Sequence, residues 1–191
     1  MTDPSKKPGS LPENIVPPKG SGQSAELTDP GAPRDYGLRI ARDGTWYHRG
    51  SPINRMPLVK LFSTVLRRED DGYWLVTPAE RGRIEVEDAP FTAVELSVTG
   101  AASTQELRFR TNLDDWVAAG PEHPIRVETA PDTGEPRPYI LVRGRLEALI
   151  LRPVFYELVG RAETKRQDGE DILGLWSQGT FFPLGRAADT D

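Results

Sequence analysis

Hydrophobic and polar residues alternate in short runs along most of this chain, and such runs are typical of β-strands. In the first such run, Leu38 and Ile40 alternate with Arg39. The pair Asp43-Gly44 separates this run from residues 45–48. Asp-Gly between two alternating runs favours a β-hairpin, because both central residues of the favoured turn need a positive φ angle. We therefore expect the fold to begin near Leu38 with a hairpin.

Two segments show helical spacing instead. The apolar positions of the first are Leu58, Leu61, Phe62, Val65 and Leu66, and those of the second are Val154, Phe155, Leu158, Val159 and Ala162. Both sets place apolar side chains on one face of a helix with 3.6 residues per turn. A proline, Pro57 or Pro153, stands at each start, where the missing N–H has no helical partner. The pattern predicts two helices, one from each proline.

Further strand-like runs flank these helices. They cover residues 73–77, 83–87, 91–98, 107–111, 116–118, 125–128, 139–143, 146–150, 172–176 and 180–184. Turn-forming residues separate them, as they do in antiparallel meanders. Many short strands with only two isolated helices predict an α+β fold built on antiparallel sheets, and not a parallel doubly wound sheet.

One motif occurs twice and suggests a duplication. In the first copy, residues 46–50 end in Arg-Gly, Arg55 and a proline open the helix, and Asp71-Gly72 leads into a strand. In the second copy, residues 140–144, Arg152 and Asp168-Gly169 occupy the same places. We expect two β-rich repeats, residues 36–98 and 99–186, each an antiparallel sheet with one flanking helix. Residues 1–35 and 187–191 are predicted to be tails.

Composition limits what the protein does. Residues 1–35 are rich in proline, glycine and serine, which predicts a disordered segment. The chain has no cysteine, which excludes disulfides, thiolate catalysis and cysteine-bound metals. A net charge of −5 with no basic block argues against nucleic-acid binding. No apolar run is long enough for a membrane span or a signal peptide, so we expect a cytoplasmic protein.

Several ordered segments resemble a known family. They are Asp43-Gly-Thr-Trp-Tyr-His, Gly50-Ser-Pro-Ile, Leu61-Phe-Ser-Thr-Val-Leu-Arg-Arg-Glu, Tyr73-Trp-Leu-Val-Thr-Pro, Glu87-Asp-Ala-Pro-Phe, Phe109-Arg-Thr-Asn, Ala119-Gly-Pro-Glu-His-Pro and Arg152-Pro-Val-Phe-Tyr-Glu-Leu. Together they resemble a proteobacterial family of uncharacterised proteins, domain-of-unknown-function family 1285, over about residues 38–185. The resemblance implies a two-domain fold of repeated β-rich motifs, each with a flanking helix. It implies ligand binding or signal transduction and supplies no catalytic residues.

Candidate ligand-binding residues come from the repeated motif and the aromatic side chains. Arg55 and Arg152 each precede or open a predicted helix, where free N–H groups and the positive end of the helix dipole favour anions. Either arginine could instead pair with a nearby acid. Trp74 and Tyr156 each adjoin another aromatic residue, and we expect them to line a cleft between the repeats. The sequence thus predicts a non-enzymatic binding or sensing module that holds a small anionic ligand or a partner protein.

Two other functions remain open. One is a hydrolase that uses carboxylates with a divalent metal, or His123 beside Asp114 or Asp115. The two histidines, His48 and His123, cannot form a zinc site without carboxylates, and no acidic cluster has the spacing of a metal-binding loop. The other is a structural homo-oligomer with an exposed apolar face. P-loop and dinucleotide-binding motifs are absent, and no residue pattern indicates a particular cofactor.

Overall fold

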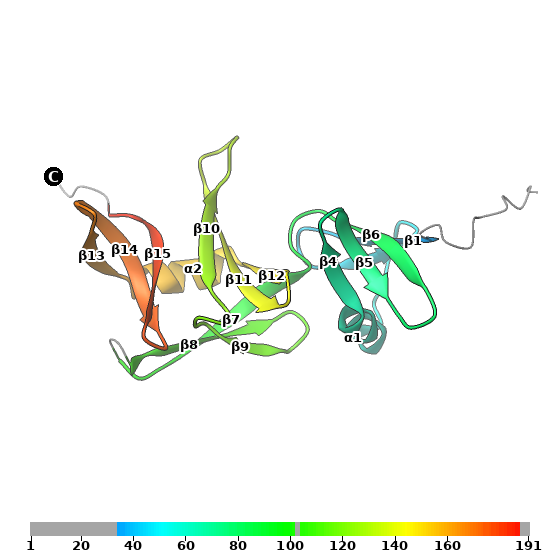
Figure 1. The fold of residues 1–191 in the computed structure, drawn as a ribbon, viewed down its shortest axis with the longest axis horizontal. Helices are drawn as coiled ribbons and strands as arrows, with labels where there is room; N and C mark the ends of the chain where they lie inside the picture. The colour runs from blue at the N-terminus through cyan, green and yellow to red at the C-terminus, as the bar shows by residue number, and fades with distance from the viewer. Residues whose placement is uncertain (1–33, 102–103, 188–191) are drawn as a thin grey trace, which may run out of the picture. The chain divides into compact units, whose positions relative to one another are not determined.

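The structure is a computed structural model, and it describes residues 34–101 and 104–187 of the chain. Strands dominate the described residues, with two helices among them (Figure 1). The predicted N-terminal tail lies outside the described residues, except for Arg34 and Asp35, which already belong to the first strand. The predicted C-terminal tail lies outside them too, apart from Ala187.

The first sheet has six strands in the order β3-β2-β1-β6-β5-β4. Their bounds are β1 Arg34–Ile40, β2 Trp46–His48, β3 Ser51–Pro52, β4 Leu66–Glu69, β5 Gly72–Val76 and β6 Arg81–Val86. The predicted hairpin is confirmed, because β1 and β2 pair antiparallel around a turn in which Gly44 has a φ of +84°. Helix α1, Met56–Thr64, connects β3 to β4 and begins beside Pro57 as predicted.

The second sheet also has six strands, in the order β10-β11-β12-β7-β8-β9. Their bounds are β7 Phe91–Thr99, β8 Glu106–Thr111, β9 Trp116–Ala118, β10 Ile125–Thr129, β11 Pro136–Arg143 and β12 Leu146–Ile150. Helix α2, Arg152–Val159, follows β12. Strand β7 belongs to this sheet, although its residues 91–98 fall within the predicted first repeat, residues 36–98.

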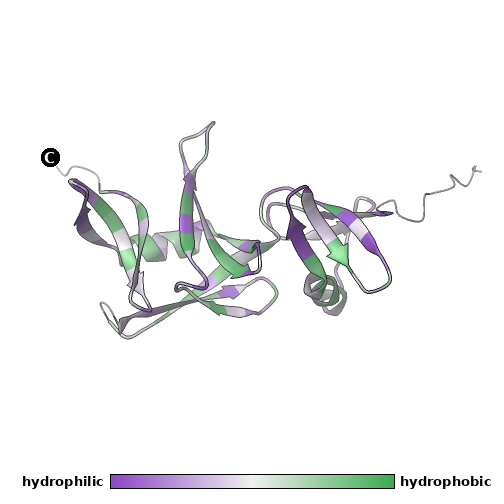
Figure 2. Ribbon diagram, in the orientation of Figure 1, coloured by the Kyte–Doolittle hydropathy of each residue, from purple (hydrophilic) through white to green (hydrophobic). Residues whose placement is uncertain are grey.

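A third, separate sheet closes the chain. It contains β13 Glu163–Gln167, β14 Glu170–Ser177 and β15 Thr180–Arg186, in that order. All five residues of β13 are exposed and polar or charged, which opposes further strand pairing, and this edge strand is coloured as hydrophilic in Figure 2. Ser177 fixes this sheet to the second one. Its hydroxyl accepts a hydrogen bond from the Leu107 amide at 2.9 Å and donates one to the Ala119 carbonyl at 2.6 Å.

The predicted antiparallel pairing is confirmed for most strand pairs, but not for all of them. Each six-stranded sheet contains one parallel pair at its centre, β1 with β6 and β7 with β12. Each sheet therefore consists of two antiparallel three-stranded meanders. The first strand of one meander pairs with the last strand of the other. The alternation of side chains reports which face a residue occupies and carries no information about strand direction.

The two six-stranded sheets share one strand order. If β1 is matched to β7 and β6 to β12, every neighbour in the first sheet has its counterpart in the second. The sequence motif instead aligns α1 with α2, which lie at different places: α1 precedes the fourth strand of its sheet, and α2 follows the sixth strand of its own. The topological repeat and the motif repeat therefore pair different elements, and an internal duplication stays a prediction.

Both helices bury one face against the sheets. In α2 the buried side chains are Val154, Phe155 and Leu158, and the helix packs on β7 and β14. In α1 the aromatic ring of Phe62 lies 6.1 Å from that of Trp46, which is 1% exposed. Leu61, which the helical pattern placed on the apolar face, is 61% exposed. Neither helix is long and apolar enough to cross a bilayer, in the part of the chain that the structure covers.

Gly82 tests the packing of the first sheet. A Cβ atom at this position of β6 would lie 2.1 Å from Cε2 of Tyr36 and 2.7 Å from the backbone oxygen of Arg34. We expect Gly82→Ala to lower the free energy of unfolding by about 1–3 kcal/mol, because the ring and the neighbouring strand must both move. Urea denaturation measures this change.

The control is Gly185→Ala in β15, where an added Cβ meets no atom within 4 Å. We expect its free energy of unfolding to stay within about 0.5 kcal/mol of the original value. Equal stabilities of the two variants would contradict the close packing of Tyr36 on β6.

Candidate functional site

A cavity of about 370 Å³ lies where the start of α2 meets β11 and β12. Three arginines from separate segments line it: Arg42 from the β1–β2 turn, Arg137 from β11 and Arg152 from α2. Apolar side chains share the lining, and they include Pro138, Leu149, Phe155 and Tyr156. We call this space the arginine cavity. Its volume falls in the range of small-molecule pockets, which combine apolar surface with a few polar groups.

Asp88 is the most deeply buried charged group of the cavity, with only 5% of its side chain exposed. It lies between β6 and β7, where the chain passes from the first sheet to the second. The Tyr139 hydroxyl donates a hydrogen bond to Oδ1 at 2.8 Å. Arg137 forms an ion pair with Oδ2, and Nε of Arg42 lies 4.0 Å from the same atom. The charge of Asp88 is thus compensated by cations that also line the cavity.

The charge on Oδ2 of Asp88 is compensated, but its capacity to accept hydrogen bonds is not filled. Although the Arg137 guanidinium touches this oxygen, Oδ2 receives no well-directed hydrogen bond from the described residues. Hydrogen bonds need aligned donors, whereas an ion pair needs only proximity. The oxygen therefore keeps the capacity to accept one more hydrogen bond.

The neighbours of Asp88 have shifted proton affinities. The pKa of Arg137 is raised, chiefly by its interaction with the Asp88 carboxylate. The pKa of the Tyr139 hydroxyl is also raised, first by burial and then by the hydrogen bond to Asp88. Near neutral pH the cluster consequently holds a charged guanidinium and a neutral phenol, which is the state that a buried carboxylate needs.

Arg152 and Tyr156, two of the predicted ligand-binding residues, meet in this cavity. Arg152 forms a 3.0 Å ion pair with Glu135, and both side chains are more than half exposed. No side chain caps the start of α2, whose N-cap residue is Leu151. Tyr156 lies one turn along the helix and is 63% exposed. An exposed arginine, an uncapped helix start and an aromatic ring thus border the same space.

The other two predicted residues lie elsewhere. Arg55 is the exposed N-cap residue of α1 and does not line the arginine cavity. Trp74 is only 3% exposed, and its indole N–H donates to Asp71 at 2.9 Å. The guanidinium of Arg81 covers its ring at 4.1 Å from the ring centre. The structure therefore brings together two of the four predicted residues, and it separates the two arginines that the motif equates.

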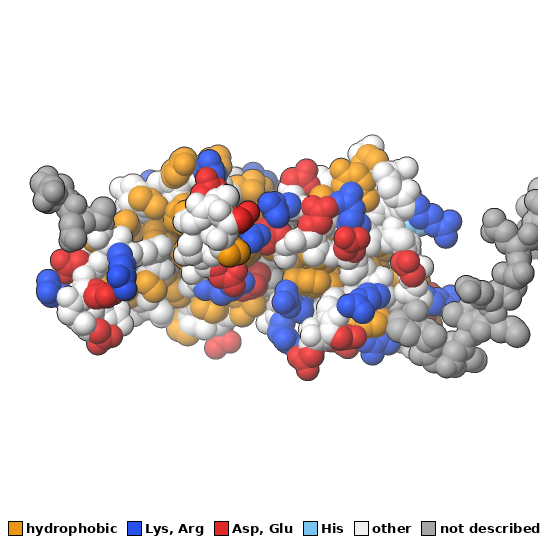
Figure 3. Space-filling view, turned by 90° about the horizontal axis from the view of Figure 1, so that it is seen from above, with side chains coloured by type: hydrophobic (Ala, Val, Ile, Leu, Met, Phe, Trp, Pro, Cys, Tyr) orange, Lys and Arg blue, Asp and Glu red, His pale blue; other side chains and the backbone are white. Residues whose placement is uncertain are grey.

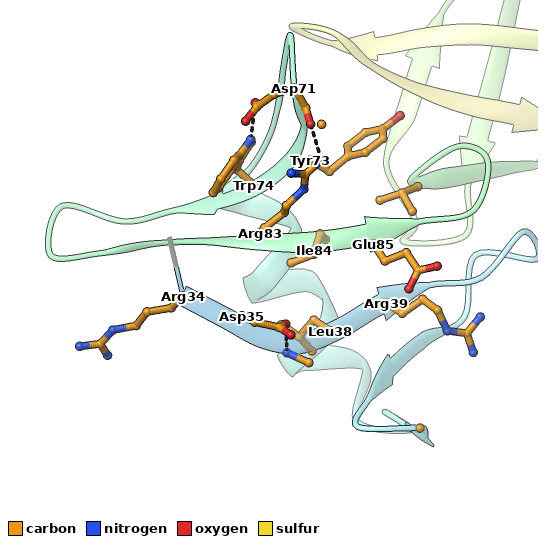
Figure 4. A pocket seen from close by; sticks show the side chains of 14 residues that line it. Arg34, Asp35, Leu38, Arg39, Asp71, Tyr73, Trp74, Arg83, Ile84 and Glu85 are labelled. Atoms are coloured by element: carbon orange, nitrogen blue, oxygen red, sulfur yellow. Dashed lines mark hydrogen bonds between the residues drawn. The ribbon is translucent and has the colours of Figure 1, made fainter. Parts of the chain in front are cut away.

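Trp74 borders a larger, open hollow of about 820 Å³ on the first sheet. Figure 4 shows Trp74 and Arg83 pointing toward Asp71, and Arg83 donates to the Asp71 carbonyl at 2.6 Å. Of the other arginines here, Arg34 pairs with Glu80 at 2.7 Å and Arg39 pairs with Glu87. Acidic and basic side chains are intermixed on the face shown in Figure 3. This hollow has the character of the solvated face of a sheet.

The groups proposed for a hydrolase are only partly assembled. Asp115, Glu122 and His123 border one open hollow, but the His123 ring pairs through Nδ1 with the Leu141 carbonyl at 3.0 Å. The pKa of Asp114 is lowered, first by Lys60 and then by Arg110, so this carboxylate stays ionised. Among residues 34–101 and 104–187, no three His, Asp or Glu side chains group closely enough to hold a metal ion. The hydrolase stays a prediction.

Sequence reasoning did not assign four charged residues of the cavity to a ligand site, namely Arg42, Asp88, Glu135 and Arg137. Each lies within two residues of another charged residue, and nothing in its local pattern distinguishes it from a solvated residue. The one signal was Asp88, which lies inside the segment Glu87-Asp-Ala-Pro-Phe on which the family resemblance rests. They meet at the cavity because β11 pairs with β12 and because the chain passes from the first sheet to the second at Asp88.

Comparisons with known proteins divide the chain between the first six-stranded sheet and the second. A model described as the N-terminal domain of DUF1285, a domain of unknown function, matches residues 25–89, and the corresponding C-terminal model matches residues 90–184. The crystal structure of a DUF1285 family protein from Silicibacter pomeroyi shares 49% sequence identity, covers 82% of this chain and 85% of its own, and has a TM-score of 0.75. A second DUF1285 crystal structure, from Shewanella baltica, shares 25% identity over 65% of this chain and 91% of its own, with a TM-score of 0.52. No curated protein matches the chain.

Asp88→Ala tests the charge cluster. Removing the carboxylate leaves the Tyr139 hydroxyl and the Arg137 guanidinium without their partner. We expect the free energy of unfolding to fall by about 1–3 kcal/mol, measured by urea denaturation at pH 7. Asp70→Ala is the control, because Asp70 pairs with Arg145 while 97% of its side chain is exposed. It should change stability by less than about 0.5 kcal/mol, and an equal loss in both variants would count against the cluster.

Tyr139 makes stability depend on alkaline pH. Its folded-state pKa is raised above the ordinary value of about 10, so the folded protein favours the protonated phenol. This contribution is complete below about pH 10 and is lost as the pH rises above that value, because the unfolded chain then releases the proton first. Between pH 9 and pH 11, the free energy of unfolding should therefore fall by about 1 kcal/mol less in Tyr139→Phe than in the original protein. Parallel urea titrations at the two pH values measure the difference, and identical losses would show that Tyr139 is not the titrating group.

Proposed function

The chain belongs to the DUF1285 family, a family of unknown function, and from the arginine cavity we propose that it is a binding module for a small anionic ligand. The observation that carries this proposal is the convergence of Arg42, Arg137 and Arg152 around one partly apolar cavity. Guanidinium groups bind carboxylates and phosphates through paired hydrogen bonds. Three of them from three segments supply such donors from different directions.

The size of the cavity favours a small molecule over a protein partner. A stable protein interface buries on the order of 1,200–2,000 Å² in total and presents a broad surface. The arginine cavity instead has a volume of about 370 Å³, which lies within the range of small-molecule pockets. The exposed side chains of Arg152 and Tyr156 leave room for a ligand to enter.

Binding at this cavity would suit a sensing role. Arg42 belongs to the segment matched by the N-terminal family model, and Arg152 belongs to the segment matched by the C-terminal one. A ligand that contacts both arginines would stabilise the arrangement of these two segments. Ligand occupancy would then change the stability of the protein without any reaction, which is the behaviour of a non-enzymatic sensor.

Arg152→Ala tests the proposal. The purified full-length chain is screened by thermal unfolding against inorganic phosphate, citrate, benzoate and short fatty acids. At 100 times its dissociation constant, an anion that binds the folded protein stabilises it by about 2.7 kcal/mol. We expect Arg152→Ala to weaken the binding of any such anion about tenfold to a hundredfold, because a hydrogen-bonded charge is lost.

Arg55→Ala is the matched control, since Arg55 is also an exposed arginine at a helix start but lies outside the cavity. It should bind the anion as well as the original protein does. Failure of every anion to stabilise the protein, or equal losses in the two variants, would reject the arginine cavity as the site.

A further inference from the structure

From the charge balance of the arginine cavity we infer that its ligand is a monocarboxylate with an apolar chain, an inference that rests on the binding function proposed above. The lining holds three cationic side chains, Arg42, Arg137 and Arg152, and two anionic ones, Asp88 and Glu135. The lining side chains therefore carry a net charge of +1. One negative charge on the ligand neutralises this excess.

The two acids of the lining oppose a more highly charged ligand. A phosphate monoester carries about −1.5 to −2 charges near neutral pH, which would leave the cavity with a net negative charge. Asp88 cannot move away to reduce that repulsion, because it is 5% exposed and held by Tyr139. A single carboxylate avoids this cost and still accepts the paired hydrogen bonds of a guanidinium.

The position of the carboxylate follows from how the arginines are already engaged. Arg137 is committed to Asp88, whereas Arg152 pairs with the exposed Glu135, whose attraction is weakened by solvent. Arg152 can consequently exchange its partner for a ligand more readily than Arg137 can. The uncapped start of α2 lies at the same residue and favours the same charge.

Apolar side chains of the cavity lining form a surface on which the apolar part of the ligand can pack. Pro138 and Leu149 come from neighbouring strands of the second sheet, and Phe155 and Tyr156 come from α2. Phe155 is 8% exposed and belongs to the core, whereas the exposed ring of Tyr156 can close over a bound chain. Because each buried methylene contributes about 0.8 kcal/mol, affinity should rise about threefold to fourfold for each added CH₂ group that the cavity accepts.

The test is calorimetric titration of the full-length protein at pH 8 with acetate, butyrate, hexanoate and octanoate, together with octyl phosphate and octanol. We expect affinity to rise with chain length until the cavity is filled. Octanoate should bind at least tenfold more tightly than either octyl phosphate or octanol.

Two pairs of variants locate the binding. Arg152→Ala should weaken octanoate binding at least tenfold, and Arg55→Ala should not change it. Tyr156→Ala should reduce the gain per methylene, while Val159→Ala, at another exposed apolar position of α2 that does not line the cavity, should leave it unchanged. These side chains are largely or partly exposed, and thermal unfolding without ligand checks that each variant folds.

The outcomes separate this inference from the proposed function. If octyl phosphate binds more tightly than octanoate and still requires Arg152, anion binding stands and the monocarboxylate inference is wrong. An affinity that does not change along the carboxylate series would also overturn the inference, because the apolar surface would then take no part. If octanol binds as tightly as octanoate, or if no probe of this series binds, the monocarboxylate inference is wrong, and the anion-binding function fails as well if phosphate, citrate and benzoate also leave the protein's thermal stability unchanged.

Discussion

A carboxylate that is almost fully removed from water must be neutralised by its neighbours, and in this protein that constraint acts at Asp88. Burying an unpaired charge costs several kcal/mol, so the surrounding chain has to supply both a counter-charge and hydrogen bonds. Tyr139 and Arg137 supply them from β11, and Arg42 approaches from the β1–β2 turn. Because Asp88 lies between β6 and β7, its partners also hold the crossing from the first sheet to the second. The same interactions place two arginines at the cavity, so the charge cluster that stabilises the crossing also prepares the site.

The cavity differs from the rest of the charged surface in what its arginines border. On the outer hollow of the first sheet, Trp74 is covered by Arg81, and the neighbouring arginines interact with acids or with backbone oxygens. Polar atoms make up a larger share of this lining than of the arginine cavity's, so the hollow interacts well with water. In the arginine cavity, charged groups and apolar side chains line one partly open space. That combination can bind an amphipathic molecule, because the apolar part contributes affinity and the guanidinium groups fix the orientation. Binding would require only that Arg152 exchange Glu135 for the ligand.

Much of the local structure could be predicted from the sequence. The Asp43-Gly44 turn and the starts of both helices at Pro57 and Pro153 are where local rules place them, since these features depend on a few adjacent residues. The parallel pairs β1–β6 and β7–β12 could not be predicted, because alternation defines the face of a strand and not its direction. Two of the four candidate site residues border the arginine cavity. Arg152 and Tyr156 are one helical turn apart and stay together in any helix, whereas Arg42 and Asp88 reach them only through the sheet topology. Trp74 was placed in a cleft because two aromatic residues are adjacent in β5, but its burial beneath Arg81 depends on a side chain from β6.

The most direct test is to map a bound carboxylate onto the backbone by recording amide chemical shifts of the isotope-labelled full-length chain during a titration with octanoate. The largest changes should occur at Arg42, Arg137, Arg152, Val154 and Tyr156, and they should saturate together with one dissociation constant. The account would be contradicted if the largest changes fell around Trp74 and Arg83 on the first sheet, or at Arg55 and the start of α1, or if no amide shifted at saturating octanoate.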